Sequence, residues 1–165
     1  MISVLFVCLG NICRSPMAEA VLRQQLQEQE LSEQVKVDSA GTGDWHIGKQ
    51  PHEGTRKILD RNNISYEGMR ARQVKLDDFQ SFDYIVCMDT NNEKDVRQLF
   101  GSRCDGHTKV FKFMSLLPER KTADVPDPYY TGNFDEVYEM ITAGCKKLVE
   151  RIKEQLHERE KEAIR

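Results

Sequence analysis

The segment that most constrains the fold is a short apolar run, followed at once by a tight turn and then by a helical pattern. Residues 2–7 form the apolar run, which is typical of a strand covered on both faces in a parallel sheet. A Gly-Asn turn pair follows within 8–15, and Ser15 and Pro16 suit the N-cap and the first turn of a helix. Apolar side chains then recur on one side of that helix, at Met17, Val21, Leu22 and Leu26. The start of the chain therefore predicts a strand–loop–helix unit.

The same alternation of strand and helix continues along the chain. The apolar patterns predict, in order, a strand at 35–40, a helix at 53–62, a strand at 84–88, a helix at 92–100, a strand at 109–113 and a closing helix over 137–156. Strands that alternate with helices imply right-handed crossovers, and so an α/β fold with a doubly wound sheet of about four parallel strands and helices on both faces. We expect a single domain over 1–165, with 154–165 as a frayed helical tail.

The composition limits the classes of protein that the chain can belong to. Its 165 residues carry a net charge of -3, whereas a nucleic-acid binder would show a clear basic excess. The apolar run near the start is too short to cross a bilayer, and no basic segment precedes it, so we expect neither a membrane span nor an export signal. Five cysteines are an odd number for a disulfide scaffold, which favours the reducing cytoplasm and reactive thiol chemistry.

The spacing Cys8-x5-Arg14-Ser15 is the sharpest chemical signal, because it falls between the expected strand and helix. Backbone N–H groups in such a loop converge on one point, and the helix N-terminus adds partial positive charge, so the loop can bind a phosphate-like dianion. The same environment favours a thiolate at Cys8. The Arg14 fork can bind two phosphoryl oxygens, and Ser15 can donate a hydrogen bond to the thiolate. Gly10 and Asn11 suit the tight turn, since Asn tolerates a left-handed backbone.

Two other loop motifs with related chemistry are excluded by residue spacing. The phosphate loop of nucleotide-binding proteins needs Gly-x4-Gly-Lys-Ser/Thr, which this chain does not contain. A thioredoxin-type Cys-x2-Cys is absent as well, because four residues separate Cys8 from Cys13. Cys-x5-Arg alone also occurs by chance, and a cysteine after a strand is often a small buried hydrophobic residue. The strand–loop–helix context favours the catalytic interpretation.

A second candidate lies in the segment 125–130, Val-Pro-Asp-Pro-Tyr-Tyr, whose two prolines we expect to prevent regular structure. A carboxylate held in a rigid loop is well suited to act as a general acid, which makes Asp127 the candidate. The two tyrosines that follow it can form the walls of a pocket. An ordinary Asp-Pro turn is the simpler interpretation of this segment by itself, and Asp124 is an alternative carboxylate nearby.

Five segments together resemble the low-molecular-weight protein tyrosine phosphatase family, and they extend over nearly the whole chain. They are Val-Cys-Leu-Gly-Asn-Ile-Cys-Arg-Ser-Pro-Met-Ala-Glu at 7–19, Asp-Ser-Ala-Gly-Thr at 38–42, Ala-Arg-Gln at 71–73, Phe-Asp-Tyr-Ile-Val-Cys-Met-Asp at 82–89 and Asp-Pro-Tyr-Tyr at 127–130. The resemblance implies that Cys8 is the nucleophile, that Arg14 binds the phosphate and that Asp127 is the proton donor. It also implies a phosphate-binding loop made of Leu9, Gly10, Asn11, Ile12, Cys13, Arg14 and Ser15.

The resemblance also assigns residues around this loop. Those implied to hold the loop in place are Asn11, Ser15, Ser39, Asp89 and Asn92. Trp45 and Tyr129 are implied to be aromatic walls of the substrate cleft. The family often has a histidine where this chain has Met69, so we expect one outer contact of the supporting network to differ.

The implied reaction is the hydrolysis of phosphotyrosine through a phosphocysteine, with no metal and no cofactor. Expected substrates are tyrosine-phosphorylated proteins or aryl phosphates, because a phenol, with a pKa of about 10, leaves more readily than an alcohol. The four histidines show no spacing typical of metal ligands. We expect a monomer or weak self-association. Cys13 is expected to form a reversible redox disulfide with Cys8, the alternative being that it only packs beneath the loop.

Three other functions can be distinguished from this one. An arginine phosphatase of the same fold is disfavoured, because that branch is implied to carry a threonine where this chain has Ile12. An arsenate reductase needs two further cysteines close together, whereas Cys87 and Cys104 lie far apart in the sequence. A module that only binds phosphate would not need Cys8 together with Asp127. One assay of phosphotyrosine, phosphoarginine and arsenate, with Cys8→Ser as control, separates all of them.

Overall fold

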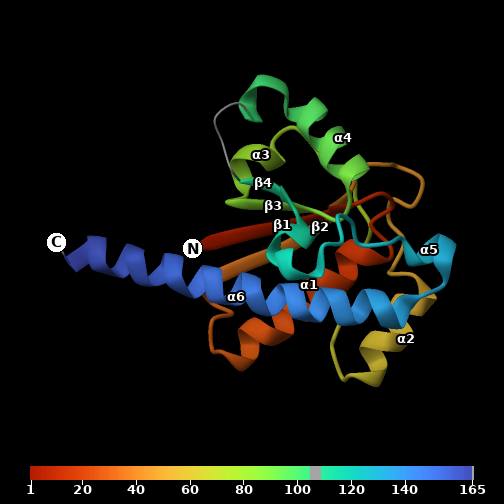
Figure 1. The fold of residues 1–165 in the computed structure, drawn as a ribbon, viewed down its shortest axis with the longest axis horizontal. Helices are drawn as coiled ribbons and strands as arrows, with labels where there is room; N and C mark the ends of the chain where they lie inside the picture. Colours follow the sequence, from red (N-terminus) through yellow and green to blue (C-terminus); the bar gives the residue numbers. More distant parts are fainter. Residues whose placement is uncertain (105–108, 165) are drawn as a thin grey trace.

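Four parallel strands form the sheet of the computed structural model, which describes residues 1–104 and 109–164 (Figure 1). The strands are β1 (Ile2–Cys8), β2 (Val35–Gly41), β3 (Tyr84–Cys87) and β4 (Val110–Lys112). Their order across the sheet is β2-β1-β3-β4, and every neighbouring pair is parallel. The predicted doubly wound α/β fold is confirmed.

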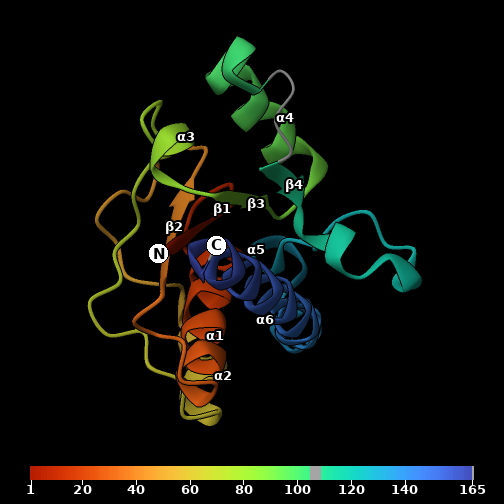
Figure 2. The same ribbon diagram turned by 90° about the vertical axis from the view of Figure 1, so that its left-hand side faces the viewer.

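Helices cover both faces of this sheet (Figure 2). They are α1 (Arg14–Glu28), α2 (Glu53–Arg61), α3 (Asp78–Ser81), α4 (Thr90–Phe100), α5 (Pro128–Thr131) and α6 (Phe134–Ile164), with short 3-10 turns at Gly101–Cys104, Phe113–Leu116 and Pro118–Arg120. Helices α1 and α6 pack on one face, with α2 beside α1, whereas α3 and α4 pack on the other. Among the described residues, no helix is both long and apolar enough to span a membrane.

Strand β1 is buried on both faces, which explains its apolar run. Val4 and Phe6 belong to the core beneath α1 and α6, whereas Leu5 and Val7 belong to the core beneath α3 and α4. All four side chains are fully buried. Alternate residues of a strand point to opposite faces, so a central strand must be apolar at successive positions.

The carboxyl end of β1 lies where the chain changes from one face of the sheet to the other. After β1 the chain enters α1 on one face and returns in β2, and after β3 it enters α4 on the opposite face and returns in β4. Ligand sites of open α/β sheets lie in the crevice at such a point, outside the carboxyl ends of the strands. The loop that follows Cys8 occupies this position.

Some local predictions were wrong at the boundaries of elements. Ser15 is not the N-cap: α1 begins at Arg14, and its N-cap Cys13 makes no side-chain capping hydrogen bond. Ser15 lies fully buried within the first turn, because its hydroxyl contacts the Cys8 sulfur. Phe113 lies in a 3-10 turn rather than in β4. Helix α6 runs through Ile164, and its last side chains are exposed.

The segment with two prolines also differs from the prediction of irregular structure. Pro128 is the first residue of α5, a single helical turn, and Asp127 is its N-cap, with Oδ1 accepting a hydrogen bond of 3.1 Å from the Tyr129 N–H. Proline suits the first position of a helix, since its fixed φ is already helical and no N–H is needed there. Gly132, with φ 75°, ends the turn. Asp127 is therefore positioned as the N-cap of a short helix.

Candidate active site

The loop between β1 and α1 curls around the sulfur of Cys8. The Asn11 N–H donates a hydrogen bond of 3.3 Å to Cys8 Sγ, and Ser15 Oγ lies 3.0 Å from the same atom. Asn11 has φ 57°, the left-handed conformation that its sequence position predicts. Cys8 is only 2% exposed. The sulfur thus lies at the bottom of a loop that directs hydrogen-bond donors to it.

The side chain of Asn11 joins three segments of the chain. Its Nδ2 donates to Ser15 Oγ at 2.8 Å and to Ser39 Oγ at 2.9 Å, and its Oδ1 accepts from the Arg72 N–H at 2.9 Å. Asn11 is almost fully buried, so these bonds replace all contact with water. They hold the loop against the end of β2 and against residues 71–73.

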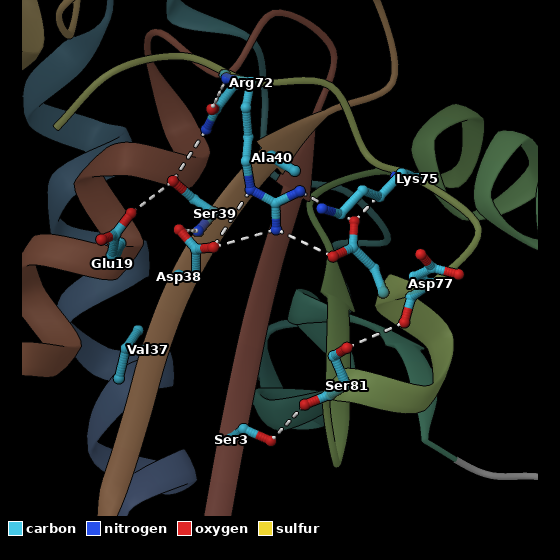
Figure 3. A network of polar contacts seen from close by, with 12 residues as sticks. Ser3, Glu19, Val37, Asp38, Ser39, Ala40, Arg72, Lys75, Asp77 and Ser81 are labelled. Atoms are coloured by element: carbon cyan, nitrogen blue, oxygen red, sulfur yellow. Dashed lines mark hydrogen bonds and ion pairs between the residues drawn. The ribbon is translucent and has the colours of Figure 1, made fainter.

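A wider polar network, shown in Figure 3, extends from these residues. Ser39 Oγ donates to Glu19 Oε1 at 2.6 Å, and the Arg72 guanidinium donates to the carboxylates of Asp38 and Asp78. Burial raises the pKa of the Glu19 carboxyl, although Arg23 and Ser39 oppose this shift. Sequence reasoning did not identify Glu19, Arg72 or Asp78. The sequence did contain one indication for Glu19: it follows Ser15 by four residues, which places both side chains on the same side of α1.

Arg14 is 2% exposed and lies beside the same loop. Its Nη1 donates to Asp89 Oδ2 at 2.7 Å and to the Val125 carbonyl at 2.9 Å, and its Nη2 lies 3.3 Å from Asp127 Oδ2. The buried Nε has no hydrogen-bond partner among the described residues. Burial lowers the pKa of Arg14, but Cys8, Asp89 and Asp127 more than compensate and raise it. The guanidinium is a fixed cation whose Nε–H is unused among the described residues.

Asp89 holds Arg14 from the end of β3. It is the N-cap of α4, so its Oδ1 accepts a hydrogen bond of 2.7 Å from the Asn92 N–H while its Oδ2 accepts from Arg14. The expected Asp89–Asn92 pair is thus a helix cap, in which Asn92 contributes its backbone. Met69, where the family often has a histidine, is buried in the apolar core next to the loop's supports.

A cleft of about 310 Å³ opens above the sulfur. The loop residues Cys8, Leu9, Gly10, Ile12 and Cys13 line it, together with Trp45, His46, Asp127, Tyr129 and Tyr130. Trp45 is 65% exposed and Tyr129 52% exposed, so aromatic rings stand at the rim rather than in the core. His46, which sequence reasoning did not assign, has its ring centroid 6.2 Å from that of Tyr129.

The alternative carboxylate, Asp124, does not line this cleft. Its Oδ1 accepts hydrogen bonds from the Thr90 N–H at 2.9 Å and from Thr90 Oγ1 at 2.8 Å, and Lys112 Nζ lies 3.5 Å away. Asp127 does line the cleft and reaches Arg14. The geometry therefore favours Asp127.

Of the other four cysteines, Cys145 is fully buried in the core beneath α1 and α6. Cys13 lines the cleft, and burial, together with the charges of Cys8 and Asp127, raises its pKa far above the usual range for a thiol. Cys87 and Cys104 pack in the core on the α4 face and do not line the cleft, although they lie near each other despite their distance in sequence. In the described part of the chain, which excludes His107, no three His, Cys, Asp or Glu side chains are grouped as metal ligands.

Fold and cleft together define an α/β protein with a cysteine-centred anion loop after its first strand. The family model described as low molecular weight phosphotyrosine protein phosphatase matches residues 3–158. The chain belongs to that family.

Individual relatives agree with this assignment. The low molecular weight protein-tyrosine-phosphatase YfkJ of Bacillus subtilis is 51% identical over 155 residues, which cover 94% of this chain and 98% of that protein. The crystal structure of YfkJ has a TM-score of 0.90 at 49% identity, and covers 94% of this chain and 96% of that one. The crystal structure of a protein tyrosine phosphatase from Entamoeba histolytica has a TM-score of 0.86 at 36% identity, and the match covers 94% of this chain and 99% of that one.

Proposed function

We propose that this protein hydrolyses phosphotyrosine monoesters in tyrosine-phosphorylated proteins through a phosphocysteine at Cys8. One observation carries the proposal: the Cys8 sulfur and the buried guanidinium of Arg14, with its unused Nε, lie together below a cleft with an aromatic rim. A fixed cation with a free N–H donor suits the equatorial oxygens of a phosphoryl group. A nucleophile at the same point suits transfer of that group.

The first chemical step transfers the phosphoryl group to sulfur. The Cys8 thiolate attacks phosphorus in line with the leaving group, so the S–P bond forms as the P–O bond to the phenol breaks. The electron pair of that bond goes to the phenol oxygen, which takes a proton from the carboxylic acid of Asp127. Loop N–H groups and Arg14 bind the three equatorial oxygens as charge spreads over them.

The second step hydrolyses the phosphocysteine. Water attacks phosphorus while the Asp127 carboxylate takes its proton, and the S–P bond breaks with its electron pair on sulfur. The Ser15 hydroxyl, 3.0 Å from Cys8 Sγ, donates a hydrogen bond to the departing thiolate. Inorganic phosphate leaves, and Asp127 is again protonated for the next cycle.

The rim of the cleft supports a phenyl ester as the substrate. The rings of Trp45 and Tyr129 offer apolar faces for an aromatic ring above the sulfur. Ile12, on the lining, offers no hydrogen-bonding side chain to a phosphoguanidinium, which weighs against phosphoarginine.

Two finer assignments go with this function. We place the reaction in the cytoplasm, because an odd number of cysteines and a reactive thiol at Cys8 suit a reducing compartment. We assign Cys13 as the residue that traps oxidised Cys8, because both line the same cleft and belong to one tight loop.

The test is hydrolysis of a phosphotyrosine peptide and of p-nitrophenyl phosphate by Cys8→Ser and Arg14→Ala proteins. Loss of a transition-state donor such as Arg14 costs roughly 100- to 1,000-fold in rate, and loss of the nucleophile costs more. Cys104→Ser is the matched control, because Cys104 packs on the α4 face of the sheet and does not line the cleft. This variant should keep wild-type rates. Phosphoarginine and arsenate are assayed in parallel. Substantial turnover by folded Cys8→Ser protein would refute the proposal.

A further inference from the structure

A second hollow, of about 660 Å³, adjoins the cleft. Ile12, His46 and Tyr129 line both spaces, so the two meet across these side chains. We refer to the second space as the basic groove, because its charged lining residues are Lys49, Arg56, Arg70 and a single acid, Glu53.

In residues 1–104 and 109–164, none of the three cations of the basic groove lies within ion-pair distance of a carboxylate, although Lys57 and, to a smaller extent, the charge of Arg56 lower the pKa of Glu53. Arg56 Nε donates to the Pro51 carbonyl at 2.9 Å, and Arg70 Nη1 donates to the Met69 carbonyl at 2.9 Å. These bonds orient the two guanidinium groups through neutral carbonyl acceptors and bring no carboxylate to ion-pair distance.

The one acid of the groove is already neutralised. Glu53 forms an ion pair with Lys57, one turn further along α2, at 3.1 Å. The groove therefore has a net positive charge on a chain whose overall charge is -3. Such a local reversal of sign attracts anionic ligands.

The groove is attached to the phosphate loop by backbone hydrogen bonds. The His52 N–H donates to the Ile12 carbonyl at 2.7 Å. The Gly48 N–H donates to the Ala71 carbonyl, and the Ala71 N–H to the Lys49 carbonyl, each at 2.8 Å. The first bond joins a groove wall to the loop around Cys8, and the other two join the groove to residues 71–73, where the Arg72 N–H in turn donates to Asn11 of that loop. A ligand could therefore occupy both spaces at a fixed separation.

We propose that the basic groove binds acidic side chains of the phosphopeptide substrate, next to the phosphotyrosine in the cleft. This inference rests on the proposed function and adds a preference among its substrates. An extended peptide advances about 3.4 Å per residue, so carboxylates within the nearest few positions can reach an adjoining groove. Charged groups at a rim act on binding and association more than on chemistry, so the preference should appear in KM rather than in kcat.

The experiment compares two phosphotyrosine peptides of equal length, one with glutamates flanking the phosphotyrosine and one with glutamines at those positions. Each exposed ion pair strengthens binding by about 1.4- to 5-fold, so two or three should favour the glutamate peptide by roughly 10-fold in kcat/KM. The preference should disappear in about 1 M salt, where charges are screened beyond about 3 Å. Hydrolysis of p-nitrophenyl phosphate tests the proposed function separately, because that substrate has no flanking residues.

The double variant Arg56→Gln/Arg70→Gln should reduce the ratio of the two kcat/KM values towards one. Lys94→Gln removes a charge from exposed α4, on the other face of the sheet, and should leave the ratio as in wild type. A ratio near one in an active wild-type enzyme, or a ratio that the double variant does not change, would overturn the inference. An enzyme that does not hydrolyse p-nitrophenyl phosphate would instead overturn the proposed function.

Discussion

The Ser15 hydroxyl oxygen lies 3.0 Å from the sulfur of Cys8, within the first turn of α1. The same oxygen accepts a hydrogen bond from Asn11 Nδ2 at 2.8 Å. The Ser15 proton can be donated to the sulfur when Cys8 is a thiolate, which accepts at 3.0 Å, whereas the Ala40 carbonyl, the other acceptor near this hydroxyl, lies 3.5 Å away. The Ser15 hydroxyl and the Asn11 N–H are thus both placed to donate to the leaving sulfur.

Removal of this donor should slow the breakdown of the phosphocysteine. A hydrogen bond to a charged group corresponds to about 10- to 100-fold in rate, so Ser15→Ala should lower kcat by that factor. Rapid mixing with p-nitrophenyl phosphate should then show a burst of p-nitrophenol before the slow steady state. The inhibition constant of inorganic phosphate, measured on the same protein, reports whether the loop is intact. Ser32→Ala, an exposed serine, is the control. A variant with unchanged kcat and no burst would exclude this role.

Loss of the Asp127 carboxyl should matter most for poor leaving groups. A general acid increases the rate by about 100- to 10,000-fold, and it is needed only when the departing oxygen would otherwise carry an unfavourable negative charge. Asp127→Ala should therefore show a steeper dependence of rate on phenol acidity than wild type does, over a series of aryl phosphates. Asp124→Ala is the matched control, since its carboxylate contacts Thr90 and not the cleft. Parallel slopes for Asp127→Ala and wild type would require another proton donor.

The fold was predictable from the sequence because its main elements are repetitive. The apolar run of β1 follows from burial on both faces, and the regular apolar spacing of α6 follows from packing on one side. The Ser15 cap was wrong for a local reason, because the hydroxyl that would cap a helix is used by the Cys8 sulfur instead. Proline prevents regular structure in the interior of a helix but suits its first position, where Pro128 stands in α5.

The candidate site was predictable only in part. Cys8, Arg14 and Asp127 lie in short segments with distinctive spacing, so a linear pattern identifies them. Glu19 and Arg72 lie in the segments 7–19 and 71–73 that carry the family resemblance, but their contacts arise only where α1, β2 and residues 71–73 meet around Asn11 and Ser39 (Figure 3). The basic groove is likewise a product of tertiary structure, since its cations come from separate segments.

The buried carboxyl of Glu19 should make stability depend on pH. Because burial raises its pKa in the folded protein, the folded state binds a proton more tightly than the unfolded chain, whose glutamate pKa is about 4.3. The contribution of Glu19 to the free energy of unfolding is therefore greatest at low pH and falls as pH rises through the folded pKa. Glutamine does not titrate, so the stability of Glu19→Gln relative to wild type should increase as the pH rises above the unfolded glutamate pKa of about 4.3.

Urea unfolding at several pH values measures this difference. Glu28→Gln, which changes an exposed glutamate at the end of the same helix, is the matched control. A flat difference for Glu19→Gln would mean that the carboxyl is ionised in the folded protein as readily as in the unfolded chain.

Oxidation of Cys8 by peroxide should be reversible only when Cys13 is present. Peroxide converts the Cys8 thiolate to a sulfenic acid and hydroxide, and attack by the Cys13 sulfur then forms a disulfide and releases water. Burial, with the charges of Cys8 and Asp127, keeps Cys13 protonated in the reduced enzyme. Formation of the uncharged sulfenic acid removes the Cys8 charge, which makes Cys13 easier to deprotonate when it is needed. Bound phosphate should protect Cys8 by covering it.

The measurement is recovery of activity by a thiol after peroxide treatment. Wild type should regain most of its activity and yield a linked Cys8–Cys13 peptide, because the disulfide prevents further oxidation. Cys13→Ser should instead lose activity permanently, with a gain in mass on the Cys8 peptide as sulfinic acid accumulates. Cys104→Ser, whose thiol packs in the core on the α4 face, should behave as wild type does. Equal recovery by wild type and Cys13→Ser, without a linked peptide, would leave Cys13 with a packing role beneath the loop, beside Ile12 and Ala71.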